Sequence, residues 1–324
     1  MFVIPRFYST FPGGNRFAPD PAQAEMRIAI FLTLPLGPTQ TPPASLTLRL
    51  RKPASHATSL THQGDLYVTS RSVEMYALTV PLDAIKRLTH ERRFAYYLLG
   101  HTFNELMCLQ KLIAFSLPKH DDHRPARLRP ELGQAMFLFR LASGKIWEAS
   151  KAVRENKELA GALREDVLPR MSDGKERLKA LNVAINNAKW LSPLRNGMGF
   201  HFPTFERWSS HVVPDESWVD DVVFLGKKSG NTYYDSADAV AQAWMFEQYG
   251  AQDLRAAIDL LIEEMISLLR LMNSFLEDAL GAFIAEVIMD RPSSPQLVGK
   301  VLAPEFERVA IPFWTAISKS PKVS

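Results

Sequence analysis

The sequence predicts an all-α fold, a bundle of four or five helices with a small β-hairpin insertion and a poorly ordered N-terminal extension. Apolar residues recur at three- and four-residue steps through most of residues 82–289, as in amphipathic helices, whereas residues 219–235 alternate as in a hairpin. Residues 1–74 are rich in proline, glycine, serine and threonine. We therefore expect a proline-rich extension over 1–74, a helical bundle over 75–290 and a C-terminal tail over 291–324.

The helices are expected in a definite order along the chain. The first ends where Leu117-Pro118 interrupts its pattern, and the second begins with Pro130 in its first turn. The third starts at a cap formed by Ser172 and Asp173 and ends at Pro193. The expected helices thus cover residues 82–117, 130 into the 150s, 173–192, 237–250 and 252–289.

Composition narrows the class of protein without naming a function. The chain has 324 residues, of which 46% are apolar and 23% charged, the balance of a globular protein that dissolves in water. Lys plus Arg number 38 against 35 Asp plus Glu, so the charge is far from the strong excess of a nonspecific DNA coat. A single cysteine, Cys108, excludes an internal disulfide framework and a thiolate-cluster zinc site. These features favour a cytoplasmic location for the protein.

No segment resembles a membrane span. The apolar run after Arg27 is nine residues long, and it reads as a weak signal peptide only if translation starts at Met26. The apolar stretch 259–289 carries charges such as Glu263, Glu264 and Arg270, which lipid would not accept. We expect a core helix there and no membrane partner.

Most familiar active-site motifs are missing from the sequence. It contains no phosphate-binding glycine loop, no G-x-S-x-G, no H-E-x-x-H and no EF-hand loop. Four residues of metal-ligand type lie in the proline-flanked link between the first two helices, where a solvated turn is the ordinary explanation: His120, Asp121, Asp122 and His123. We therefore expect neither a metal nor a cofactor.

One short segment, LRNGMGFHFP, carries a functional signal. Arg195 is followed by the polar Asn196, and five residues, 196–200, separate it from His201. The segment resembles the R-x(4–6)-H signature of HEPN-domain proteins, in detail over residues 174–205 and in helical layout over about 82–290. The resemblance implies an all-helical, dimeric protein, and many members of the family are metal-independent endoribonucleases of toxin–antitoxin and anti-phage systems.

The same spacing also joins Arg49 and Arg51 to His56, but those residues lie in the proline-rich extension. The match at Arg195 ends an apolar-striped helix and lies among aromatic residues, so it is the candidate site. On an unbroken helix Arg195 and His201 would lie about 120° apart around the axis and ~9 Å apart along it. Either the helix unwinds here, or a second protomer completes the site.

The three motif residues have chemically distinct expected roles. His201 can move a proton to or from a ribose oxygen near neutral pH, and Arg195 offers a planar pair of donors to phosphate oxygens. The amide of Asn196 can fix either the phosphate or the imidazole. The candidate catalytic residues are therefore Arg195, Asn196 and His201, and the expected partners are RNA, a second copy of the chain and an antitoxin.

A structural alternative stays open for the same residues. Arg195 can simply cap a helix C-terminus and His201 can be an interface residue, which would make the protein a catalytically inactive helical module that binds a protein or RNA partner. We expect the aromatic residues around the motif to belong to the core rather than to a base-stacking platform. They are Phe200, Phe202, Phe205, Trp208 and Trp218.

Overall fold

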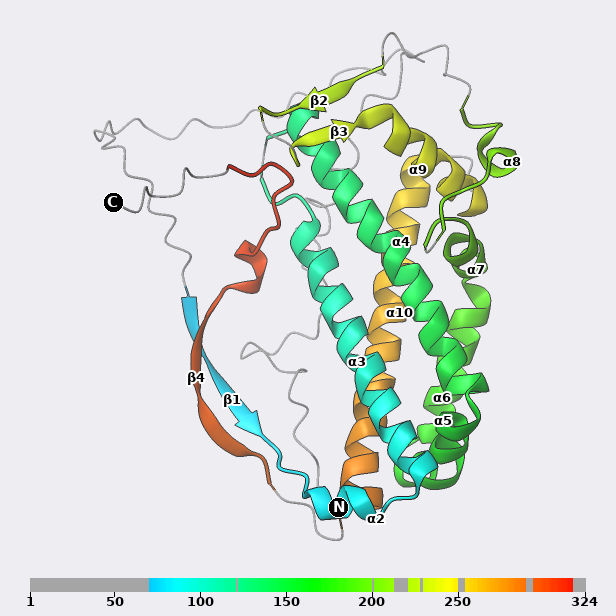
Figure 1. Ribbon diagram of the computed structural model, residues 1–324, viewed down its shortest axis with the longest axis vertical. Coiled ribbons are helices and arrows are strands. Elements are labelled where there is room, and N and C mark those ends of the chain that lie inside the picture. Colours follow the sequence, from blue (N-terminus) through cyan, green and yellow to red (C-terminus); the bar gives the residue numbers. More distant parts are fainter. Residues whose placement is uncertain are drawn as a thin grey trace, which may run out of the picture.

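The computed structural model describes residues 70–120, 122–199, 201–212, 221–227, 230–249, 254–289 and 294–316. Most of these residues are helical, and two small sheets of two antiparallel strands complete the described part of the fold (Figure 1). The prediction of a mainly helical fold with a hairpin is confirmed. No helix among the described residues is long and apolar enough to cross a bilayer.

The described helices and strands follow one another in a simple order. The helices are α2 (Leu82–Arg87), α3 (His90–Ser116), α4 (Pro125–Glu155), α5 (Lys157–Ala162), α6 (Gly174–Asn187), α7 (Leu191–Leu194), α8 (Phe205–Trp208), α9 (Asp235–Tyr249) and α10 (Leu254–Ala282). Short π-helical or 3₁₀ turns cover Leu163–Val167, Leu168–Arg170, Arg195–Gly199, Phe283–Ile288 and Phe306–Arg308. The strands are β1 (Ser70–Ala77), β2 (Val223–Leu225), β3 (Thr232–Tyr234) and β4 (Gln296–Pro304).

The core lies between the long helices α3, α4 and α10, which run side by side (Figure 1). On α3 the buried apolar residues recur at three-, four- or seven-residue steps, so they lie on one face: Ala95, Leu99, Leu106, Leu109 and Ile113. Helices α5, α6 and α7 pack against this group. As a result α4 contacts the segment after α7, which carries the candidate motif.

The single helix expected over 82–117 is wrong, because the chain forms two helices there. Leu88 is extended between α2 and α3, and the Thr89 side chain accepts a hydrogen bond from the amide of Arg92 at 3.3 Å. Such a cap satisfies one of the unpaired amides at the start of a helix. The apolar periodicity continues across the break, which is why the pattern alone suggested one helix.

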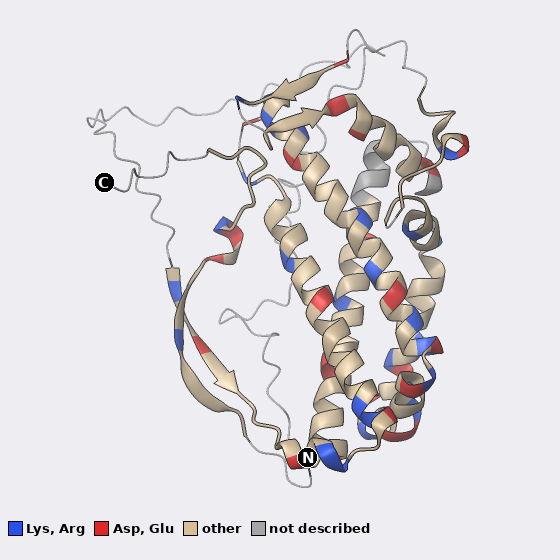
Figure 2. Ribbon diagram, viewed as in Figure 1, with Lys and Arg blue, Asp and Glu red and all other residues tan. Residues whose placement is uncertain are grey.

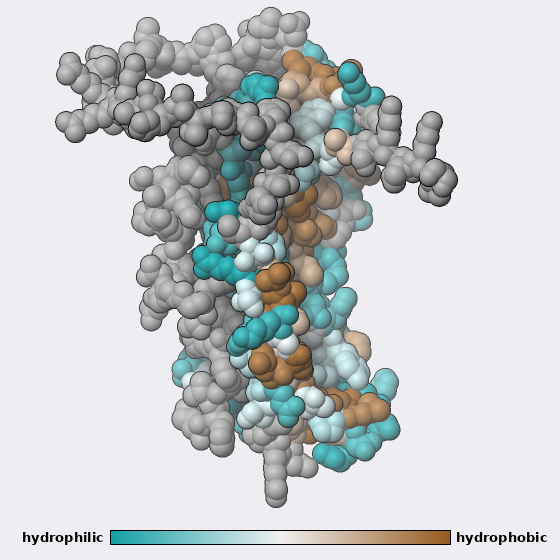
Figure 3. All heavy atoms as spheres, turned by 90° about the vertical axis from the view of Figure 1, so that its left-hand side faces the viewer, coloured by the Kyte–Doolittle hydropathy of each residue, from teal (hydrophilic) through white to brown (hydrophobic). Residues whose placement is uncertain are grey.

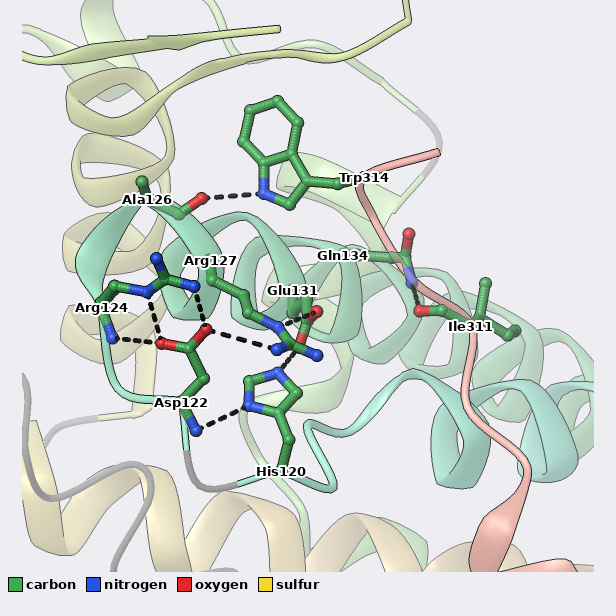
Figure 4. Close-up of polar contacts among 9 residues, drawn as sticks. All are labelled: His120, Asp122, Arg124, Ala126, Arg127, Glu131, Gln134, Ile311 and Trp314. Atoms are coloured by element: carbon green, nitrogen blue, oxygen red, sulfur yellow. Dashed lines mark hydrogen bonds and ion pairs between the residues drawn. The ribbon is translucent and has the colours of Figure 1, made fainter. Parts of the chain in front are cut away.

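The second predicted helix begins five residues earlier than expected, since α4 starts at Pro125 and Pro130 lies inside it. A proline inside a helix cannot donate to the carbonyl four residues before it, here that of Ala126. That carbonyl instead accepts a hydrogen bond from the indole Nε1 of Trp314 at 2.8 Å (Figure 4). The C-terminal segment thereby satisfies the group that Pro130 leaves unpaired.

The third predicted helix is shorter than expected and is not capped as expected. Asp173 precedes α6 with a left-handed φ of 55°, and its side chain makes no capping hydrogen bond. The helix ends at Asn187, and the buried Trp190 leads into the separate helix α7. The stripe that predicted one helix up to Pro193 therefore spans two.

The expected hairpin is confirmed by β2 and β3, which pair from Val223 opposite Tyr234 to Leu225 opposite Thr232. The hairpin packs on α4 at Gly133, because a Cβ on that glycine would lie 2.3 Å from the Tyr233 hydroxyl oxygen. The final helix, expected over 252–289, is also confirmed as α10 with its π-helical continuation.

The strands β1 and β4 form an antiparallel ribbon that the sequence did not predict. Its register runs from Ser70 opposite Pro304 to Ala77 opposite Gln296, with an irregularity between Met75 and Tyr76. Figure 3 faces the side of the molecule that bears this ribbon and shows apolar surface there. The boundary expected after residue 74 falls inside β1, and the expected tail supplies the partner strand. The rest of the expected extension, 1–69, lies outside the described residues.

Candidate functional site

The Arg195–His201 segment lies where a regular helix stops. Leu191 and Leu194 are buried and fix α7 to the core, and the chain then forms a π-helical turn over Arg195–Gly199. Such a turn holds more residues than an α-helical one. The helical winding therefore changes at the motif. Such a change was one of the two ways in which the sequence analysis expected Arg195 and His201 to be brought together.

The two glycines of the turn allow close packing. A Cβ on Gly197 would lie 2.1 Å from Cη2 of the buried Trp244, and one on Gly199 would lie 3.3 Å from the carbonyl oxygen of Arg140 on α4. The turn is therefore pressed between α9 and α4. Trp244 belongs to the buried core.

Arg195 is held by carboxylate and amide groups of the protein. Its Nε and Nη2 lie 2.9 and 2.7 Å from the same oxygen of Glu148, Oε1, on α4. Its Nη1 donates to the side-chain oxygen of Asn196 at 2.7 Å. The Arg195 side chain is 31% exposed. The guanidinium is thus oriented from two sides and still reaches the surface.

Asn196 links Arg195 to two further groups. Its side-chain amide donates to the hydroxyl of Ser192 at 3.3 Å, and its backbone carbonyl accepts from Nη1 of Arg207 on α8 at 3.0 Å. Pro193, Asn196, Gly197, Arg207 and Trp244 line a cavity of about 270 Å³. Two arginines therefore converge on Asn196 beside a small cavity.

His201 is exposed just beyond the turn. Among the described residues, no hydrogen bond or ion pair joins it to Arg195 or Asn196. Asn196 and His201 are thus both exposed, but within one chain no hydrogen bond links the imidazole to the guanidinium.

The expectation that the neighbouring aromatic residues are core is wrong for two of them. Phe202 is 97% exposed and Phe205 is 75% exposed. Trp208, at the end of α8, does pack against the core. Phe200 and Trp218 lie outside the described residues. The sequence pattern could not reveal the exposure of these two rings. Phe202 lies in a loop and Phe205 at the start of a four-residue helix, and neither is long enough for periodicity to separate an inner from an outer face.

A second and larger hollow is lined by residues of α3 and α4, among them Glu148. It measures about 520 Å³ and follows the groove between α3 and α4. Glu148, the ion-pair partner of Arg195, lines it together with the ion pair of Glu105 and Lys145, which are 2.9 Å apart. In the view of Figure 2, basic and acidic residues are interspersed over the bundle.

The link between α3 and α4 forms an ion-pair network among the described residues (Figure 4). His120 Nε2 lies 2.7 Å from Oε2 of the buried Glu131, and His120 Nδ1 accepts from the backbone amide of Asp122 at 3.1 Å. Hydrogen bonds from Arg124 hold the pKa of the Asp122 carboxyl well below its usual range, and Arg127 adds to this effect.

These contacts account for two of the four candidate metal ligands in the link, His120 and Asp122. Asp121 lies outside the described residues. No group of three or more His, Cys, Asp or Glu in the described part of the chain has the arrangement of a metal site. The network connects the link to the first turns of α4.

Sequence reasoning did not identify Glu148 or Arg207 as parts of the site. Glu148 pairs with Arg195 across 47 positions of the chain, and such a pair has no signature in a single sequence. Arg207 follows the motif closely, and its place among the aromatic residues is the one signal that could have marked it.

Comparison of the chain with protein-family models, curated proteins and solved structures gave no match. The candidate site is therefore defined by its own geometry. It is a surface of a mainly helical protein on which Asn196 connects Arg195 to Arg207. His201, Phe202 and Phe205 are exposed in the segment between Asn196 and Arg207.

Proposed function

We propose that this protein is a HEPN-like endoribonuclease that cleaves RNA without a metal ion. The observation that carries the proposal is the hydrogen-bonded series Glu148–Arg195–Asn196–Arg207, which holds two guanidinium groups beside the exposed His201 segment. Oriented guanidinium groups stabilise the charge that develops on a phosphate during transfer. The resemblance of the motif to the HEPN signature supplies the identity of the substrate.

The reaction uses proton transfer at the ribose. His201 removes the proton of the 2′-hydroxyl, the 2′-oxygen attacks phosphorus, and the bond to the 5′-oxygen breaks. A histidine of the second copy returns a proton to that 5′-oxygen. Arg195 stabilises the phosphate oxygens, and Asn196 orients Arg195. The products are a 2′,3′-cyclic phosphate and a 5′-hydroxyl.

The proposal extends to the setting of the protein. A cytoplasmic homodimer with the motif at its interface would bring two arginines and two histidines to one cleft, which suits a phosphodiester with one attacking and one leaving oxygen. A toxin–antitoxin or anti-phage role, with an antitoxin as partner, follows from the resemblance.

A catalytically inactive binding module is the second candidate. The ion pair between Arg195 and Glu148 favours it, because that pair occupies the Nε and Nη2 donors that would face a phosphate. In this case the same surface binds RNA or protein without cleaving it.

The two candidates are separated by one assay. We expect the purified protein to cleave single-stranded RNA in the presence of EDTA and to release 2′,3′-cyclic phosphate ends. His201→Ala should abolish cleavage, whereas His90→Ala, an exposed histidine at the start of α3, should retain it. Arg195→Lys should stay impaired, because an ammonium lacks the planar fork. Cleavage that survives His201→Ala would exclude this site.

A further inference from the structure

Phe202 and Phe205 are the two most exposed large apolar side chains of the described residues, at 97% and 75%. Scattered apolar residues on a surface need no explanation, but Phe202 directly follows His201 in the chain and Phe205 lies four residues after it. Burial of either ring against a partner would remove a large apolar area from water. Their position therefore indicates that something covers them when the site is occupied.

The segment that carries the two rings is fixed to the candidate site. Trp208 packs against the core at the end of α8, and Arg207 donates to the carbonyl of Asn196. Phe205, at the start of the same short helix, is consequently held at a defined place beside the motif. The site thus presents aromatic faces on a supported element rather than on a free end.

The charges near the rings indicate which partner fits. Arg195 is partly exposed and Arg207 is exposed, and within the described part of the chain the Arg207 guanidinium donates only through Nη1. Guanidinium groups next to exposed aromatic rings are suited to a flexible polyanion with flat apolar faces. Single-stranded RNA has both features, whereas a duplex hides its base faces within the stack.

We propose that Phe202 and Phe205 stack on bases of single-stranded RNA next to the phosphate that His201 and Arg195 engage. This inference rests on the proposed function and specifies its substrate as unpaired RNA. The two phenylalanines are positioning residues: they hold the nucleotides next to the scissile bond and transfer no proton. Loss of a stacked base of this kind weakens binding by about 5- to 150-fold.

Binding is tested without cleavage. In a His201→Ala background, the affinity for a fluorescein-labelled single-stranded RNA oligonucleotide is measured by anisotropy, with 2′-O-methyl groups to prevent cleavage. We expect Phe202→Leu and Phe205→Leu each to weaken binding by about 5- to 150-fold, and the tyrosine variants to stay close to the parent protein. Phe137→Leu, on a phenylalanine of α4 that is 54% exposed, is the matched control and should have no effect.

Several results would overturn the stacking proposal. They are unchanged affinity in both leucine variants, equal affinity for a duplex of the same sequence, and absence of any binding to the single strand.

Loss of a dimer in the leucine variants, seen by light scattering, would instead assign the rings to contact with a second copy. If the leucine variants lose binding although the wild-type protein does not cleave RNA, stacking holds and the nuclease proposal fails. If the wild-type protein cleaves RNA but the leucine variants bind normally, the nuclease proposal holds and the stacking proposal fails.

Discussion

Gly197 is the residue on which the packing of the candidate turn depends most directly. An added Cβ would lie 2.1 and 2.7 Å from two carbons of the Trp244 indole, which is only 6% exposed. We expect Gly197→Ala to lower the free energy of unfolding by ~1–3 kcal/mol, as other overpacked substitutions do. Thermal and chemical denaturation measure the change.

Gly161→Ala provides the control for that substitution. Gly161 lies in α5, and a Cβ there would meet no atom within 4 Å. Alanine is favoured over glycine within a helix by ~0.5–1 kcal/mol, so this variant should be neutral or more stable. Equal losses in the two variants would mean that contact with Trp244 is not the cause.

Asp122 should make the stability of the fold sensitive to acid. Because hydrogen bonds from Arg124 depress the pKa of its carboxyl, the folded state favours the charged form. This contribution is fully present above the ordinary pKa of about 3.9 and is lost as the pH falls from there through the depressed folded-state pKa. We expect the stability difference between wild type and Asp122→Asn to be larger at pH 7 than at pH 3 in chemical denaturation.

Asp83→Asn is the comparison for this pH effect, because the Asp83 side chain is 88% exposed and its nearest partner, Lys86, lies 3.6 Å away. It should change stability little at either pH. A difference between wild type and Asp122→Asn that stayed constant from pH 7 to pH 3 would contradict the role assigned to the carboxylate.

Single residues of the site were only partly predictable. The spacing of Arg195, Asn196 and His201 marked a segment in which Asn196 and His201 are exposed, and both the site and the chemical roles stay predictions. The contact of Arg195 with Glu148 could not be predicted, because periodicity reports the faces of one helix and not which residues on two helices meet.

At the scale of elements, Pro130 and Trp314 are related through one carbonyl group, that of Ala126. Two single substitutions and their combination test whether the effects of the two residues on stability are coupled. Trp314→Phe removes the donor to the Ala126 carbonyl, and we expect a loss of ~0.5–1.5 kcal/mol in unfolding free energy. In a Pro130→Ala background the restored amide of residue 130 can donate to the same carbonyl, so Trp314→Phe should cost less. Chemical denaturation of the four proteins gives the coupling energy.

Equal effects of Trp314→Phe in both backgrounds would show that the two residues act independently. Gln134 offers a parallel control on the same helix, because its amide donates to the carbonyl of Ile311 at 2.9 Å and does not depend on Pro130 (Figure 4). The coupling of Gln134→Ala with Pro130→Ala should therefore be close to zero.

Elements with a large buried face were predicted best. The existence of the helices α3, α4 and α10 followed from their apolar periodicity, whereas the break at Thr89 and the start at Pro125 depend on single hydrogen bonds and on a proline tolerated inside a helix. The ribbon of β1 and β4 was missed because none of its residues lies in the buried core and its two strands, although paired, lie more than 200 positions apart in the sequence.

At the scale of the whole molecule, the arrangement of the motif leads to a prediction about oligomeric state. The guanidinium of Arg195 is turned toward Glu148 and Asn196, and among the described residues His201 has no bond to either arginine of the site. If a second copy completes the cleft, one intact arginine and one intact histidine can come from different chains. We expect a dimer by light scattering at micromolar concentration.

Complementation tests whether the cleft is shared between two chains. Arg195→Ala and His201→Ala should each be inactive as homodimers, but their co-refolded mixture should regain part of the cleavage activity. Each heterodimer keeps one arginine and one histidine that acts as the base, and water replaces the missing histidine as the proton donor to the 5′-oxygen. A mixture of His201→Ala with the Arg195→Ala/His201→Ala double variant contains no histidine at the site and should stay inactive. Two differently tagged chains verify by co-purification that heterodimers have formed. Heterodimers that form without any recovery, or a protein that is monomeric while it cleaves RNA, would mean that one chain carries the entire site.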